Sequence, residues 1–206
     1  MPISPGSEWG TPSPIPDHAR VMSADRQLGL FLRDNSAQQI HAQSLFMQSG
    51  DITRVLGVKS RSNNDECIRV IIDAISVSYT DAHGVEHTDV CIGSLSIARR
   101  FLRGAICIVS NSGYWNDHEV APRARLNDGK LDIFEVSGAM RWSQRRLMWQ
   151  KTSLGTHLPH PLLSYSQGDF SHWEGSPQRI TIDGQFVATV TKVACRIQSD
   201  CVQIYA

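Results

Sequence analysis

Residues 110–136 have the sequence SNSGYWNDHEVAPRARLNDGKLDIFEV, and this stretch is the most informative about the fold. Apolar residues at 105–109 predict a strand that leads into this stretch, and alternating apolar residues at 131–136 predict a strand at its end. Between them, the Asn-Asp-Gly sequence at 127–129 is typical of a tight turn, because Asn and Asp bond their own backbone and glycine accepts positive φ. The stretch therefore predicts two strands joined by an ordered connection.

A period of two in the apolar residues extends on both sides of this stretch. It predicts strands at residues 53–58, 67–80, 85–97, 179–182, 186–197 and 201–205. In the second of these strands the parity of the apolar residues switches, which predicts a bulge. Residues 81–84 (Asp-Ala-His-Gly) predict a hairpin turn. We therefore expect a mainly β fold, an antiparallel β-sandwich-like domain with a few peripheral helices.

Three segments predict those helices, at residues 21–33, 36–48 and 143–154. Asn35 or Ser36 could cap the second helix and Ser143 the third, and Gly50 and Gly155 are typical stop signals. Residues 1–18, rich in Pro, Ser and Gly, predict an extended arm. We expect a first region, 1–50, made of the arm and two helices, followed by a β-rich domain at 51–206.

The composition of the chain argues against some functional classes of protein. The 206 residues are enough to bury a core. The 20 Lys and Arg residues balance the 20 Asp and Glu residues, which argues against a nucleic-acid binder driven by bulk charge. Five cysteines without a C-x-x-C pair indicate reduced thiols in a cytoplasmic protein. No apolar run approaches the roughly 20 residues of a membrane span, so we expect any membrane contact to be peripheral.

Several short motifs occur in the same order as the motifs of a known protein family. Asn111 is followed by Val-Ala-Pro at 120–122 and by N-D-G-x-L-D at 127–132, an order similar to that in the C-terminal half of the diacylglycerol kinase and bacterial lipid kinase family. Residues 155–161 (GTHLPHP) resemble the family's G-H-x-x-H-P segment, and residues 182–185 (IDGQ) resemble its V-D-G-E. The resemblance covers residues 51–206 and rests mainly on the segment from V-A-P to N-D-G-x-L-D.

The resemblance implies a second domain without its nucleotide-binding partner. The family's N-terminal domain carries a Gly-Gly-Asp-Gly-Thr phosphate loop, and this sequence contains no such run. We therefore do not expect ATP to bind this chain alone, and we interpret it as a lipid-binding or accessory module. Two alternatives stay open. The chain could be a fragment or subunit of an active ATP-dependent lipid kinase, with the nucleotide domain on a separate chain, or a structural domain that forms homodimers.

The resemblance also implies candidate site residues. Asp183 and Gln185 stand where the family has the carboxylates used for proton transfer, but a glutamine amide is no base near neutral pH. The alternative is a hairpin turn that uses Asp-Gly for its geometry. The family's structural Mg²⁺ site maps onto the side chain of Asp128 and the backbone carbonyls of Arg125 and Lys130. With one carboxylate, this predicts a weak site.

A basic, aromatic helix and a histidine segment complete the candidates. Arg145 and Arg146 lie among tryptophans and could meet lipid headgroups or nucleotide phosphates, or simply lie on a solvated helix face. His157 and His160 are candidates for the same lipid or phosphate contact. Two other interpretations of the histidines are a zinc site and a rigid linker in which they hydrogen-bond backbone carbonyls.

Overall fold

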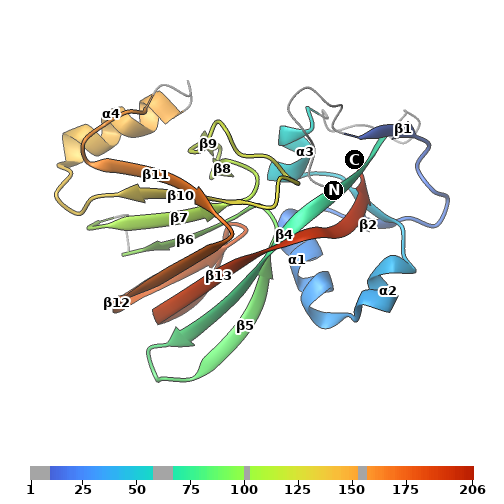
Figure 1. Cartoon of the computed structure of the whole chain (residues 1–206), viewed down its shortest axis with the longest axis horizontal. Coiled ribbons are helices and arrows are strands. Elements are labelled where there is room, and N and C mark those ends of the chain that lie inside the picture. The colour runs from blue at the N-terminus through green and yellow to red at the C-terminus, as the bar shows by residue number, and fades with distance from the viewer. Residues whose placement is uncertain (1–9, 58–66, 100–102, 153–156) are drawn as a thin grey trace.

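The computed structural model describes residues 10–57, 67–99, 103–152 and 157–206 (Figure 1). Within these ranges the fold is mainly β, a large antiparallel sheet of 11 strands with four helices, two of them short. The expected fold class is therefore confirmed. None of the described helices is long and apolar enough to cross a lipid bilayer.

The strands of the large sheet follow the hydrogen-bonded path β1-β4-β13-β12-β6-β7-β10-β11, with β2, β3 and β5 attached beside it. A separate two-stranded sheet is formed by β8 and β9. The strands are β1 (Thr11–Ser13), β2 (Arg20–Met22), β3 (Leu45–Met47), β4 (Cys67–Asp81), β5 (Glu86–Cys91), β6 (Ser94–Ala98), β7 (Ile106–Ser110), β8 (Tyr114–Trp115), β9 (His118–Glu119), β10 (Leu131–Val136), β11 (Leu163–Gly168), β12 (Phe170–Ile182) and β13 (Gln185–Tyr205). The helices are α1 (Asp25–Asp34), α2 (Ala37–His41), α3 (Asp51–Val55) and α4 (Trp142–Thr152).

The long antiparallel pair β4 and β13 runs through the whole fold (Figure 1). The predicted parity switch in β4 is present, since residues 72–75 are buried in succession. The extra residues belong to the partner strand, however. Gln198 pairs with Ala74 and Val202 pairs with Ile72, so the irregularity lies in β13. A bulge of this kind bends a strand and increases its twist.

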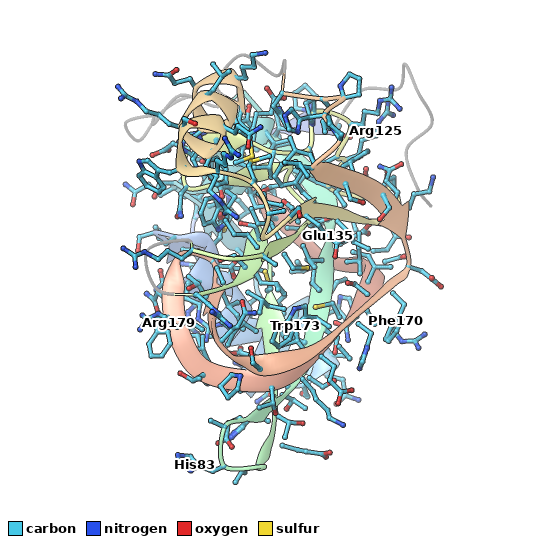
Figure 2. The ribbon with its side chains drawn as sticks, turned by 90° about the vertical axis from the view of Figure 1, so that its left-hand side faces the viewer. His83, Arg125, Glu135, Phe170, Trp173 and Arg179 are labelled. Atoms are coloured by element: carbon cyan, nitrogen blue, oxygen red, sulfur yellow. The ribbon has the colours of Figure 1, made fainter. Side chains whose placement is uncertain are left out.

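The sheet curls so that distant strands share one apolar core. Ile75 and Val77 of β4 pack in the same buried cluster as Leu131 of β10. Figure 2 shows β12 curving strongly between Phe170 and Arg179, in the region where its register with β13 shifts. Two further buried clusters lie under α1 and under α4. These three cores hold both ends of the sheet and the helices together, because each buried Leu or Ile contributes roughly 1.5–3 kcal/mol.

In the N-terminal third, the structure corrects the bounds of two predicted helices. The helix predicted at 21–33 begins only at Asp25, because Arg20–Met22 forms β2. The helix predicted at 36–48 ends at His41, and Leu45–Met47 forms β3, which pairs in parallel with β13 and β2. Burial of Leu45 and Met47 in a strand that lies between β13 and β2 outweighs their helix propensity. The predicted cap Ser36 is confirmed by a capping box with Gln39.

Other boundaries also differ from the predictions. The strand predicted at 53–58 is helix α3 in its described part, with Ile52 buried against the core. The single strand predicted at 85–97 is divided into β5 and β6 by a break at residues 92–93. Helix α4 begins at Trp142, before the predicted cap Ser143, and the predicted stop Gly155 lies outside the described residues. In the expected N-terminal arm, Thr11–Ser13 pairs with β4.

Candidate functional site

The hairpin turn between β12 and β13 holds the first candidate residue. Ile182 pairs with Gln185, so Asp183 and Gly184 form a two-residue loop. Both residues have positive φ, 46° and 78°, which is typical of a type I′ hairpin turn. The Asp-Gly sequence therefore has a geometric use at this position, and Gln185 lies exposed beside it.

The carboxylate of Asp183 binds the break between β5 and β6. Its Oδ1 accepts the N–H of Gly93 at 2.8 Å and that of Ser94 at 3.2 Å, and its Oδ2 accepts the N–H of Ile92 at 3.1 Å. The Cys91 thiol donates to Oδ1 at 3.2 Å. Burial raises the pKa of Asp183, while these hydrogen bonds oppose the rise. The side chain joins the β12–β13 turn to the β5–β6 connection.

Helix α1 brings a second carboxylate to the same place. Asp25 is only 7% exposed, its Oδ2 accepts the N–H of Asp51 at 2.6 Å, and its Oδ1 has no hydrogen-bond partner among the described residues. A Cβ on Gly93 would lie 3.2 Å from Oδ2 of Asp25 and 3.5 Å from Oδ1 of Asp183, so both carboxylates flank this glycine. Burial first, and then the charge of Asp183, raise the pKa of Asp25 to about 7.

We refer to Asp25, Asp51 and Asp183 as the carboxylate cluster. Burial raises the pKa of Asp51 as well, although Arg54, 3.7 Å away, opposes the rise. Asp25 and Asp51 were not predicted as site residues, because they stand in the first turns of α1 and α3, where acidic residues are common. The described residues contain no group of three or more His, Cys, Asp or Glu side chains that could hold a metal. The three carboxyls share one feature, namely that burial raises the pKa of each.

The Asn-Asp-Gly turn lies at another point of the sheet, beside β4. The buried carboxylate of Asp73 accepts the N–H of Gly129 and that of Asp200, both at 2.8 Å, and so joins the turn to the bulge of β13. Oδ1 of Asp128 accepts the N–H of Lys130 at 3.1 Å. Burial raises the pKa of Asp128, and the charges of Lys130 and Arg125 oppose the rise. Magnesium binding by Asp128 with the carbonyls of Arg125 and Lys130 stays a prediction.

The two candidate arginines have different environments. Arg145 is buried, and its guanidinium donates to the carbonyls of Met140 at 3.0 Å, Ser137 at 2.9 Å and Gly104. These contacts hold α4 to the loop before β7. Arg146 is exposed on the outer side of the helix. Of the two, only Arg146 is placed to meet a ligand from solvent.

The two candidate histidines lie in the segment after α4. Nε2 of His157 donates to the carbonyl of Val120 at 3.0 Å, and the ring packs edge-on against Phe134. Burial lowers the pKa of His157. Nδ1 of His160 accepts the N–H of Leu162 at 3.1 Å. For His157 the backbone-carbonyl interpretation is confirmed, while lipid or phosphate contact by either histidine stays a prediction.

A groove lies between the helices α1 and α2 and the sheet. Its volume is about 350 Å³, and its lining combines apolar and polar side chains, with Arg33 and Asp89 as opposite charges. The lining residues are Leu32, Arg33, Ala37, Ile40, His41, Ser76, Thr88, Asp89, Val90, Gln198 and Cys201. Such a lining suits an uncharged amphiphile, because apolar walls cover its tail and a few polar groups orient its head.

Comparisons with known proteins found a structural similarity at low sequence identity. No protein-family model matches the chain, and no curated protein does. Among solved structures, the chain is similar to "a putative diacylglycerol kinase from Bacillus anthracis str. Sterne", at 13% identity and a TM-score of 0.49, over 79% of this chain and 67% of that one. A structure named as a diacylglycerol kinase of the same organism matches at 14% identity and a TM-score of 0.44, over 79% and 68%.

A further structure named like the first one, from the same organism, matches at 14% identity and a TM-score of 0.38. The match covers 64% of this chain and 39% of that one, so this chain spans less than half of that protein. These findings are a structural similarity to diacylglycerol-kinase-like proteins at low sequence identity. They identify no activity.

Proposed function

We propose that this chain is a lipid-kinase-related domain, like the second domain of that family, which binds a neutral lipid or amphiphile and does not transfer phosphoryl groups by itself. The order of the sequence motifs from Asn111 to Gln185 supports the relationship. The observation that carries the proposal is the binding of the Asp183 carboxylate by three backbone N–H groups and a thiol. A carboxylate held in this way has a structural role.

Phosphoryl transfer to a lipid hydroxyl needs a group that aligns the hydroxyl and accepts its proton. At the β12–β13 turn, Asp183 accepts hydrogen bonds from the thiol of Cys91 and from three backbone N–H groups, and Gln185 replaces the glutamate of the similar motif. The turn therefore offers one carboxylate that is fixed in place by these hydrogen bonds, in place of two. The sequence also contains no Gly-Gly-Asp-Gly-Thr loop for the nucleotide. Both features favour a binding or accessory role over catalysis.

The groove beside α1 and α2 is the proposed lipid site. Asp89 on its wall is bound by Arg26, and Arg33 pairs with Asp34 at 2.8 Å. The charges of the lining are therefore balanced, which suits a neutral head group such as the hydroxyl of a diacylglycerol. Ile40 is half-buried on its wall. A Glu at this position would place a charge where the acyl chain is expected, and would block binding.

Thermal unfolding with and without ligand tests the proposal. Diacylglycerol in detergent micelles is expected to raise the Tm of the wild-type chain, because a ligand that binds the native state stabilises it by RT ln(1 + [L]/Kd). The increase is expected to vanish in Ile40→Glu and to persist in Val85→Glu, a matched change at a residue exposed outside the groove. An increase with ATP and Mg²⁺ but none with lipid would contradict the proposal.

A second candidate, a fragment or subunit of an active lipid kinase, is favoured by one observation. Asp25 has a pKa of about 7 and an unpartnered Oδ1 beside Asp183, and a general base works best when its pKa lies near the working pH. Transfer of labelled phosphate from ATP to diacylglycerol would reveal such activity. Loss of that transfer in Asp25→Asn, but not in Asp34→Asn on the exposed side of the same helix, would establish this second candidate and overturn the first.

A further inference from the structure

The outer face of α4 is exposed at one edge of the molecule. Figure 1 shows α4 beside β11, at the opposite end from α1 and α2. Arg145, Met148 and Thr152 form the buried side of the helix and fix its orientation. Most of the remaining helix surface faces solvent, and Trp142 and Leu147 lie on it about 140° apart around the helix axis.

This surface carries the two most exposed large apolar side chains of the described residues, Trp142 at 72% and Leu147 at 53%. The exposed rings elsewhere have a different explanation. Arg179 lies over the ring of Phe186 at 3.8 Å, and Arg196 lies over that of Phe170 at 5.6 Å, both at the β12–β13 ribbon (Figure 2). An exposed Trp and Leu on one helix mark an interaction surface more strongly than scattered apolar residues do.

The helix that carries these two side chains also carries exposed cations and has no acidic residue of its own. Arg141, Arg146 and Lys151 are exposed, and residues 136–168 contain no Asp or Glu at all. Arg103 is also exposed, next to Gly104, the residue whose carbonyl binds Arg145 in α4. The chain as a whole has zero formal net charge, so this concentration of positive charge is a local feature.

We propose that the outer face of α4, formed by Trp142, Arg146, Leu147 and Lys151 together with Arg141, docks onto an anionic lipid bilayer. Indole rings favour the interface between headgroups and acyl chains, leucine enters the acyl boundary, and Lys and Arg pair with anionic headgroups. The combination of both kinds of side chain on one convex helix favours a bilayer over a nucleic acid, which would need the cations alone. The inference does not rest on lipid binding in the groove.

Co-sedimentation with lipid vesicles tests this surface. The full chain is expected to sediment with vesicles of phosphatidylcholine and phosphatidylglycerol, not with phosphatidylcholine alone, and to be released by added sodium chloride. The double variant Trp142→Ser, Leu147→Ser and the single variant Lys151→Glu are each expected to weaken binding about tenfold or more. Inorganic phosphate is expected to release no more protein than chloride of equal ionic strength.

Two matched controls change exposed residues away from α4. Val85→Ser removes an apolar side chain as exposed as Leu147, and Arg69→Glu reverses a charge on β4 as Lys151→Glu does on α4. Both are expected to bind anionic vesicles like the wild type. Equal binding to neutral and anionic vesicles, no binding to either, or unchanged binding by the α4 variants would overturn the proposal. Because the substituted side chains are exposed, unchanged Tm values will show that every variant is folded.

Discussion

At the scale of single residues, Asp25 is a buried carboxyl whose hydrogen bonds are incomplete among the described residues. Its carboxyl is buried, one oxygen has no hydrogen-bond partner among the described residues, and Asp183 lies nearby with the same charge. A Cβ on Gly50 would come within 2.2 Å of Oδ1 of Asp25, and Gly50 has a φ of 130°. The backbone at residue 50 is thus glycine-specific for two reasons, the space and the conformation.

The pKa of Asp25 predicts how stability depends on pH. Its native pKa of about 7 is above the ordinary value of 3.8, so between these pH values the native state binds more protons than the unfolded state. The free energy of unfolding therefore falls as pH rises through this range and levels off above about pH 7. A shift of this size corresponds to roughly 4 kcal/mol.

Asp25→Asn is expected to remove this dependence, because the amide carries no charge and its oxygen can still accept the N–H of Asp51. Urea unfolding at pH 5 and pH 8 measures the pH dependence of the free energy of unfolding. The variant is expected to be more stable than the wild type at pH 8, with a smaller difference between the two pH values. Asp34→Asn, on the exposed side of α1, is the control. A wild-type protein that gains stability from pH 5 to pH 8 through Asp25 would contradict the assignment.

At the scale of elements, α1 is fastened to β5 by a buried ion pair. Nη1 and Nη2 of Arg26 donate to the two carboxylate oxygens of Asp89 at 3.0 and 2.7 Å, and both side chains are almost fully buried. Bidentate geometry of this kind is strong, but removal of one partner leaves an uncompensated buried charge. Arg33, 3.8 Å from Asp89, compensates only in part because it also pairs with Asp34.

Arg26→Met is expected to lower the free energy of unfolding by roughly 3–5 kcal/mol, since Asp89 remains buried without its main partner. The double variant Arg26→Met, Asp89→Leu is expected to recover much of this loss. A double-mutant cycle in urea gives the coupling energy between the two positions. Additive effects of the single variants would show that the ion pair does not couple α1 to the sheet.

At the scale of the whole molecule, β4 and β13 connect the cores. Ile72 and Ile204 pack with Leu28 of α1 in one cluster, while Ile75 and Val193 pack with Leu131 in another. The same two strands therefore contribute to the cluster under α1 and to the one inside the curled sheet. If one of these two clusters lost its packing, β4 and β13 would lose part of their contacts, and the second cluster would be destabilised as well.

We therefore expect unfolding in one cooperative transition. Tryptophan fluorescence reports on Trp115 and Trp149 near α4 and on Trp173 beside the core of the curled sheet. Far-ultraviolet circular dichroism reports on the sheet and all helices. The two signals are expected to give the same urea midpoint, as two-state unfolding requires. Separate midpoints would show that the region under α1 unfolds independently of the sheet.

The sequence by itself determined the mainly β class, the long strand predicted at 67–80 and observed at Cys67–Asp81, both Asp-Gly turns and the capped start of α2 at Ser36. Each of these depends on local signals, namely a period of two, turn residues that accept positive φ, or a capping side chain. The last strand was predicted in two pieces, at 186–197 and 201–205, and the gap between them falls on the bulge of β13. Local chemistry was sufficient wherever a residue acts on its immediate neighbours.

Only the tertiary structure decided that Leu45–Met47 is a strand, that Arg145 is buried, and that Asp25 meets Asp183. Each of these results depends on partners far away in the chain, such as Ile204 for Leu45 and Gly104 for Arg145. Pairing with a distant strand and the burial of a charge both depend on which surfaces come into contact when the chain folds. Local periodicity in the sequence does not encode these contacts.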